Sequence, residues 1–157
     1  SSERTLLLII IASPDWRGRG DVDTAWFEGV EYREIFDALA AEPAQPLAAV
    51  FPQRLSAASQ RIWEGLVQAA NSLEGQRVDE MYEGAKEVLA SRTGFRRLYQ
   101  LDREMEAAPP EQREALMREK SALREAIEKA YPLAWSKRAS WPRLVNANRA
   151  KQRKNRQ

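Results

Sequence analysis

Apolar side chains recur at helical spacing along most of the chain. In the segment after Thr24, four of them follow the i, i+3, i+4, i+7 pattern of one helix face, namely Tyr32, Ile35, Phe36 and Leu39. Charged residues fill much of the remaining circumference. We therefore expect an amphipathic helix here that ends by Pro43.

Four further apolar stripes follow, and they predict four more helices. They cover residues 56–74, 78–94, 95–105 and 110–131. Gly75 and Gly94 are suited to helix C-termini, and the third helix should end before Pro109. Pro110 can occupy the first turn of the last helix, where its missing N–H would have had no partner.

The last of these helices is highly charged, and its apolar stripe is narrow. The stripe consists of Leu116, Leu123, Ile127 and Tyr131. Two oppositely charged pairs have the favourable i, i+4 spacing, Glu114 with Arg118 and Glu125 with Lys129. A narrow stripe contacts a single neighbour, so we expect a helical hairpin with the helix at 95–105. The alternative is a two-helix coiled-coil docking surface.

The N-terminal apolar run has no helical periodicity. Residues 5–12 (TLLLIIIA) are rich in β-branched Ile, form a short run and stop at Ser13 and Pro14, which predicts a buried strand. The one candidate partner is the segment 47–51 (LAAVF), which is bounded by prolines. If both are strands, the residues between them form a βαβ crossover.

These patterns predict a mainly α-helical protein of five or six helices. We expect one short N-terminal strand, or a minimal two-strand element, and a basic C-terminal extension. An α/β fold is the alternative. The predicted organisation is an acidic helical body at residues 1–131, followed by a basic, Trp-containing extension at residues 132–157.

Charge divides the chain into two parts. The last nine charged residues are all basic: Lys129, Lys137, Arg138, Arg143, Arg149, Lys151, Arg153, Lys154 and Arg156. Residues 1–128 contain 16 basic and 23 acidic residues, a net charge of −7, although the whole chain has a net charge of +2. A local positive field attracts phosphate, anionic lipid or an acidic protein surface.

The extension has the chemistry of a nucleic-acid contact. Basic side chains displace counterions from phosphates, and the candidates are Lys137, Arg138, Arg143, Arg149, Lys151, Arg153, Lys154 and Arg156. Trp135 and Trp141 either stack on unpaired bases or anchor the extension to the body. An acidic protein surface is an alternative partner. The acidic body of another copy is a further one, and it would give head-to-tail association.

Composition excludes several kinds of chemistry. The chain has no Cys and no His, which removes disulfides, thiolate metal sites and triads that contain His. We therefore expect no cofactor and no enzymatic activity. Six N-terminal acids suggest a magnesium-dependent phosphoryl-transfer enzyme as an alternative, but they also suit helix caps and a polar helix face: Asp15, Asp21, Asp23, Glu28, Glu31 and Glu34.

The longest apolar run, residues 6–12, is far shorter than the roughly 20 residues of a membrane-spanning helix. We expect no membrane span and a cytoplasmic location. The favoured function is a non-enzymatic accessory or assembly subunit, whose body docks a protein while the tail contacts nucleic-acid phosphates. A scaffolding module that forms homo-oligomers without nucleic acid is the alternative.

Overall fold

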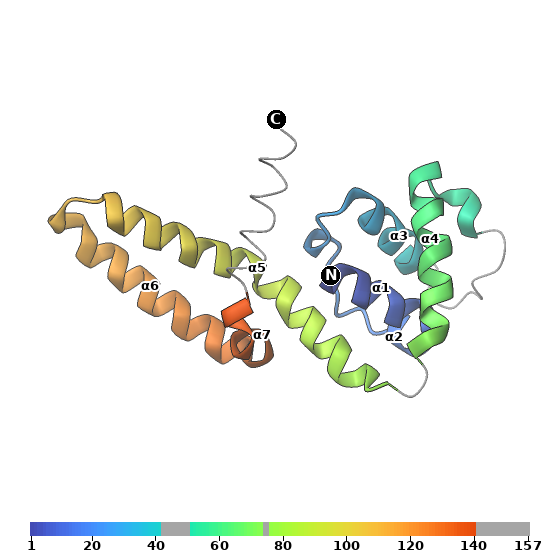
Figure 1. The fold of residues 1–157 in the computed structure, drawn as a ribbon. Helices are drawn as coiled ribbons and strands as arrows, with labels where there is room; N and C mark the ends of the chain where they lie inside the picture. The colour runs from blue at the N-terminus through green and yellow to red at the C-terminus, as the bar shows by residue number, and fades with distance from the viewer. Residues whose placement is uncertain (42–50, 74–75, 141–157) are drawn as a thin grey trace. The chain divides into compact units, whose positions relative to one another are not determined.

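The computed structural model describes residues 1–41, 51–73 and 76–140, and all regular structure in these residues is helical (Figure 1). The α-helices are α1 (Ser2–Ala12), α2 (Pro14–Arg17), α3 (Val30–Ala41), α4 (Ala57–Ala70), α5 (Val78–Ala107), α6 (Pro110–Ala130) and α7 (Pro132–Ser136). Short 3₁₀-helices are η1 (Thr24–Trp26), η2 (Phe51–Arg54), η3 (Asn71–Leu73) and η4 (Arg138–Ser140). The prediction of a mainly α-helical protein is confirmed.

The chain folds into two compact units. Unit 1 is Ser1–Ala90 and unit 2 is Ser91–Gln157. The division falls inside the continuous helix α5, which contributes its first part to unit 1 and its second part to unit 2. The boundary predicted at residues 131–132 coincides with the turn between α6 and α7, within unit 2.

The predicted N-terminal strand is wrong, because residues 5–12 belong to helix α1. Its six consecutive Leu and Ile residues, 6–11, are all buried, and α1 packs against α2, α3 and α4. A helix surrounded by other helices has no polar face, so its sequence shows no periodicity. The modest helix penalty of Ile is small beside about 1.5–3 kcal/mol for burying each side chain.

The candidate partner strand lies mostly outside the described residues, at 47–50. Its last residue, Phe51, begins η2. No strand occurs in the ranges that the structure describes, so the βαβ crossover finds no support there.

Carboxylates connect the helices of unit 1 by binding helix N-termini. The Glu3 carboxylate of α1 is buried and accepts hydrogen bonds from the backbone N–H groups of Glu28 (2.7 Å) and Gly29 (3.1 Å), just before α3. The Glu34 carboxylate of α3 accepts from the Ser56 N–H (2.5 Å) and from the Ser59 hydroxyl (2.8 Å) at the start of α4. Helix α1 thus provides a capping carboxylate for α3, and α3 provides one for α4.

Unit 2 is built on the predicted helical hairpin, in which the second part of α5 and helix α6 run antiparallel (Figure 1). Helix α6 starts after Pro109, with Pro110 in its first turn, and the predicted Glu114–Arg118 ion pair is present at 2.6 Å. Glu125 and Lys129 form no ion pair in the part of the chain that the structure describes.

The helix stop predicted at Gly94 is wrong. Gly94 lies inside α5, so the predicted helices 78–94 and 95–105 are one helix. A Cβ at position 94 would lie 3.0 Å from Cδ1 of Ile127 on α6. The glycine therefore leaves space for the Ile127 side chain. It allows α5 and α6 to approach each other closely and does not end α5.

Candidate functional site

Three of the ten predicted nucleic-acid-binding residues lie in the part of the chain that the structure describes. They are Trp135, Lys137 and Arg138, in α7 and just after it. The other seven lie outside the described residues: Trp141, Arg143, Arg149, Lys151, Arg153, Lys154 and Arg156.

Trp135 packs on the hairpin. The backbone breaks direction at Tyr131 and Pro132, and this turn brings the α7 indole alongside Phe95 of α5, with ring centroids 6.1 Å apart and planes inclined by 20°. The guanidinium groups of Arg138 and Arg124 lie 4.7 and 5.7 Å from the indole centroid. Trp135 is half-buried and is therefore an anchor of α7 as well as the centre of a cationic cluster.

The cations around α7 differ from those farther along the hairpin. Among the described residues, Arg124, Lys129, Lys137 and Arg138 are exposed and form no ion pair with a carboxylate. In the hairpin, by contrast, Arg97 binds Glu119 (2.9 Å) and Glu104 (3.1 Å), and Lys120 binds Asp102 (2.5 Å). The cationic cluster, defined as these four exposed residues, keeps an uncompensated positive charge.

Ion pairing in the hairpin shifts the pKa values of its charged groups. The hydrogen bond from Arg97 lowers the pKa of Glu119, and the hydrogen bond to Glu119 raises the pKa of Arg97. Each of these charged groups is thus compensated by an oppositely charged neighbour. The net positive charge of unit 2 comes from residues 129–157.

The charge of the chain divides between the two units. Unit 1 contains 8 basic and 15 acidic residues, a net charge of −7, and unit 2 contains 17 basic and 8 acidic residues, a net charge of +9. Residues 91–128 are balanced, with eight of each sign. All of the excess positive charge of unit 2 therefore lies at residues 129–157.

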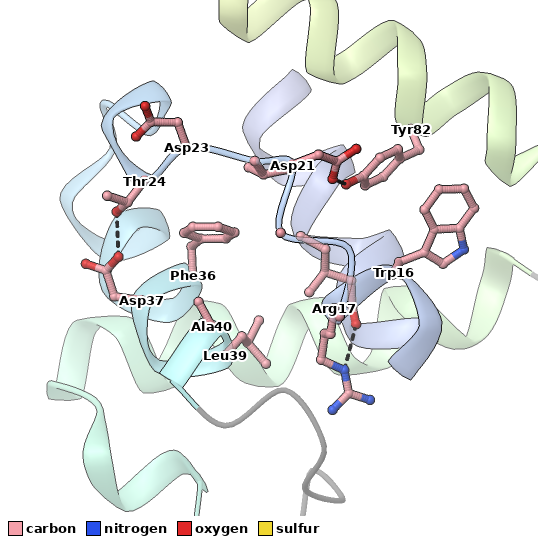
Figure 2. Close-up of a pocket in the computed structure, with 14 residues that line it drawn as sticks. Trp16, Arg17, Asp21, Asp23, Thr24, Phe36, Asp37, Leu39, Ala40 and Tyr82 are labelled. Atoms are coloured by element: carbon pink, nitrogen blue, oxygen red, sulfur yellow. Dashed lines mark hydrogen bonds between the residues drawn. The ribbon is translucent and has the colours of Figure 1, made fainter.

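Unit 1 contains a pocket of about 470 Å³ (Figure 2). Apolar side chains from α1, α2 and α3 line it, among them Ile10, Trp16, Phe36 and Leu39. Its charged lining comes from Arg17 and from three carboxylates, Asp21, Asp23 and Asp37. Its size and its mixture of apolar walls with a few polar groups are those of a binding pocket.

Asp21 joins the loop before η1 to the start of α5. Gly20 has a φ of 68°, a left-handed conformation that glycine adopts at little cost. The residue after this turn, Asp21, faces Tyr82 and Lys86. The Tyr82 hydroxyl donates to Asp21 Oδ1 (2.5 Å) and the Lys86 ammonium donates to Oδ2 (2.9 Å).

The environment of this cluster changes the ionisation of its members. Burial raises the pKa of Asp21, but the hydrogen bonds from Tyr82 and Lys86 outweigh it and lower the pKa overall. Burial and the neighbouring Asp21 carboxylate raise the pKa of Tyr82 far above its ordinary range. Asp21 is thus held as an anion beside a neutral phenol and a cation.

Asp23 and Asp37 each use one carboxylate oxygen within the fold. Asp23 Oδ1 accepts from the Ala25 N–H (2.9 Å) and so caps the start of η1. Asp37 Oδ1 accepts from the Thr24 hydroxyl (2.5 Å). In Figure 2, Asp23 and Asp37 lie on the same side of the pocket.

The N-terminal acids that the sequence suggested as a magnesium site do not gather at one place, because several of them bind other groups of the fold. Asp21 binds Tyr82 and Lys86, Asp23 caps η1, and Glu34 caps α4. Within residues 1–41, 51–73 and 76–140, no group of three or more acidic side chains is placed to hold a metal ion.

Sequence patterns alone missed the pocket. Tyr82 is part of the apolar stripe of its helix, and nothing in the sequence pairs it with Asp21, 61 positions earlier.

No helix in the described part of the chain is long and apolar enough to cross a membrane.

Comparisons with known proteins leave the chain without a family assignment. No protein-family model matches it, and neither the search of curated proteins nor that of solved structures finds a match.

Proposed function

We propose that this protein is a non-enzymatic accessory subunit of a nucleoprotein or multi-protein assembly. Its basic C-terminal residues contact nucleic-acid phosphates, and its acidic unit 1 docks a protein. The contact with nucleic acid is mainly electrostatic and carries little base specificity, because Lys and Arg side chains that neutralise phosphates read no base edges.

The observation that carries the proposal is the segregation of charge. Residues 129–157 contain nine basic and no acidic residues, and the four exposed cations of the cationic cluster form no ion pair with a carboxylate within the described ranges. Their positive charge is compensated by no carboxylate there, although Arg138 donates a hydrogen bond to the Trp135 carbonyl oxygen (3.0 Å), and is therefore available to an external anion. Phosphate suits the five Arg residues among these nine, because a guanidinium binds two phosphate oxygens at once.

Trp135 has a structural role in this proposal. Its ring is engaged by Phe95, so it holds α7 on the hairpin and presents Arg138 and Lys137 beside it. Trp141 remains the candidate for stacking on an unpaired base.

The docking part of the proposal is supported by the pocket in unit 1. It combines apolar walls with carboxylates, so it suits an apolar side chain flanked by basic residues. Unit 1 as a whole carries −7, which would repel nucleic acid and favour a basic protein surface.

The nucleic-acid contact can be tested with one variant pair. In the first variant, five tail residues are changed to Ala: Arg149, Lys151, Arg153, Lys154 and Arg156. In the matched control, five exposed Arg residues outside the tail are changed to Ala: Arg4, Arg61, Arg77, Arg103 and Arg118. Both variants lose five positive charges.

Binding to labelled single-stranded and double-stranded DNA and RNA is measured by fluorescence anisotropy across a salt series. We expect the tail variant to lose most of its affinity for all sequences and most of its salt slope, which is about 0.7–0.9 per phosphate contact. The control variant should keep the salt slope. Equal losses in both variants, or a loss confined to one nucleotide sequence, would contradict the proposal.

A further inference from the structure

The charged residues that line the pocket of unit 1 favour a cationic ligand over an anionic one. Three carboxylates and one guanidinium line it. Asp21 accepts hydrogen bonds from Tyr82 and Lys86 through both of its oxygens, whereas the exposed Asp23 and Asp37 each accept a hydrogen bond through Oδ1. The second oxygens of these two carboxylates are available to a cationic ligand at the edge of the pocket.

An occupant must therefore combine a bulky apolar group with nearby positive charge. The apolar group enters among Trp16, Phe36 and Leu39, and the positive charge lies beside Asp23 and Asp37. A small anion is disfavoured because the lining has a net negative charge. Peptides with an aromatic anchor flanked by basic residues fit this description, since aromatic anchors supply most of the binding energy at such sites.

The chain contains such a segment of its own. Residues 141–157 (WPRLVNANRAKQRKNRQ) include Trp141, Leu144 and Val145 together with six basic and no acidic residues. This composition complements unit 1, whose net charge is −7. Arg143 lies between Trp141 and Leu144, so a bulky apolar side chain and a positive charge are close together in the sequence, and the other five basic residues follow from position 149 onward.

We propose that the pocket of unit 1 binds residues 141–157 of a second copy of this chain, with the Trp141 indole in the pocket and Arg143 beside Asp23 and Asp37. The contact joins a pocket on one copy to a tail on the next, so it is heterologous and extends into rings or chains of copies. The proposal rests on the docking half of the proposed function, and it uses the same tail that contacts nucleic acid there, so the pocket and nucleic acid compete for residues 141–157.

Two single variants remove opposite sides of this contact. Ala40→Lys places a cation at an exposed position of the pocket lining, near the C-terminus of α3, where a positive charge suits the helix dipole. It removes no hydrogen bond within unit 1. Trp141→Ala removes the anchor and leaves the tail charges intact. Gln68→Lys, on the exposed surface of α4, is the matched control for the added charge.

Self-association of the full chain is measured by sedimentation velocity over a range of concentrations at low and high salt. We expect association that weakens as salt rises, and dissociation constants about ten-fold higher for Ala40→Lys and about 30-fold higher for Trp141→Ala. Gln68→Lys should associate like the unaltered chain.

The decisive measurement mixes the two defective chains. Ala40→Lys keeps an intact tail and Trp141→Ala keeps an intact pocket, so the mixture can form one heterologous contact. We expect each variant alone to be monomeric at a concentration where the mixture forms a one-to-one dimer and no larger species. Circular dichroism confirms that both variants are folded before the mixing experiment is interpreted.

Three outcomes would overturn the proposal. The unaltered chain stays monomeric at low salt, Ala40→Lys associates like Gln68→Lys, or the mixture of folded variants stays monomeric. Nucleic-acid binding by Ala40→Lys is measured in parallel, because this variant should keep it. A failed self-association with intact nucleic-acid binding therefore rejects this inference and leaves the phosphate contact standing.

Discussion

The two units of this protein are each held together by a different kind of contact. In unit 1, helices α2, α3 and α4 pack around the apolar residues 6–11 of α1, and carboxylates bind the N-termini of helices. In unit 2, two long amphipathic helices meet along a narrow apolar stripe, and carboxylates bind Arg and Lys side chains instead. A buried core and helix caps therefore stabilise unit 1, whereas apolar contacts along a single stripe stabilise the hairpin.

This difference also determines where charge is left over. Unit 1 uses some of its carboxylates in caps and has few cations, so it stays acidic. The hairpin balances its charges, and the basic excess lies beyond α6. Exposed ion pairs contribute little to stability, so their main consequence here is to neutralise the hairpin.

The largest expected effect is on the core of unit 1. Leu7 is fully buried in α1, and Leu7→Ala should lower the free energy of unfolding by about 3–4 kcal/mol, through lost burial and the cavity that remains. Leu116→Ala, at a half-buried position of the α6 stripe, should cost about 1 kcal/mol.

Urea unfolding gives the free energies, and hydrogen exchange read by peptide locates the loss. Protection should fall in α1, α3 and α4 for Leu7→Ala. A similar cost for the two variants would mean that the hairpin core is as important per side chain as the buried helix, which would remove the contrast between the units.

The next effect compares two glycines inside helices. Gly94→Leu should destabilise the hairpin by about 1–3 kcal/mol, because the space for Ile127 is lost. Gly65 in α4 is exposed, and a Cβ there meets nothing within 4 Å, so Gly65→Ala should stabilise unit 1 by about 0.5–1 kcal/mol. Thermal unfolding by circular dichroism measures both. Stabilisation by Gly94→Leu would show that α5 and α6 do not depend on close approach.

The smallest effect concerns the cap between α3 and α4, and it depends on pH. The hydrogen bonds from the Ser56 N–H, the Ser59 hydroxyl and the Ser56 hydroxyl lower the pKa of Glu34 below its ordinary value of 4.5. A carboxyl with a lowered pKa stabilises the fold above its unfolded-state pKa, and that stabilisation is lost as the pH falls through the folded-state value. Glu34→Gln should therefore unfold at a lower temperature at pH 7, and the difference should shrink below about pH 4.5.

Glu64→Gln is the control for this measurement, because Glu64 is an exposed residue of α4 outside the cap. Its unfolding temperature should match that of the unaltered chain at every pH. A constant difference between Glu34→Gln and the unaltered chain from pH 7 to pH 3 would show that the ionised cap does not stabilise unit 1.

The sequence by itself determined the amphipathic helices, because a helix with one buried and one exposed face must repeat its apolar residues every 3.6 positions. It also determined the start of α6, where Pro109 and Pro110 interrupt one helix and open the next. The segregation of charge, and with it the eight basic candidate contact residues, follows from the order of charged residues alone, and Trp135 and Trp141 are the aromatic residues beside them. None of those residues needed the fold to be identified, although their role as a phosphate contact stays a prediction.

The tertiary structure decided what periodicity cannot encode. Residues 6–11 are apolar on every side, so only the helices around them show that they belong to α1 and not to a strand. Glycine is common at helix ends, and only the contact with α6 shows that Gly94 instead leaves space for the side chain of Ile127. The pocket likewise unites residues from α1, α2, α3 and α5 with those of the loop before η1. Such features depend on which surfaces meet, and local sequence carries no information about a partner that is distant along the chain.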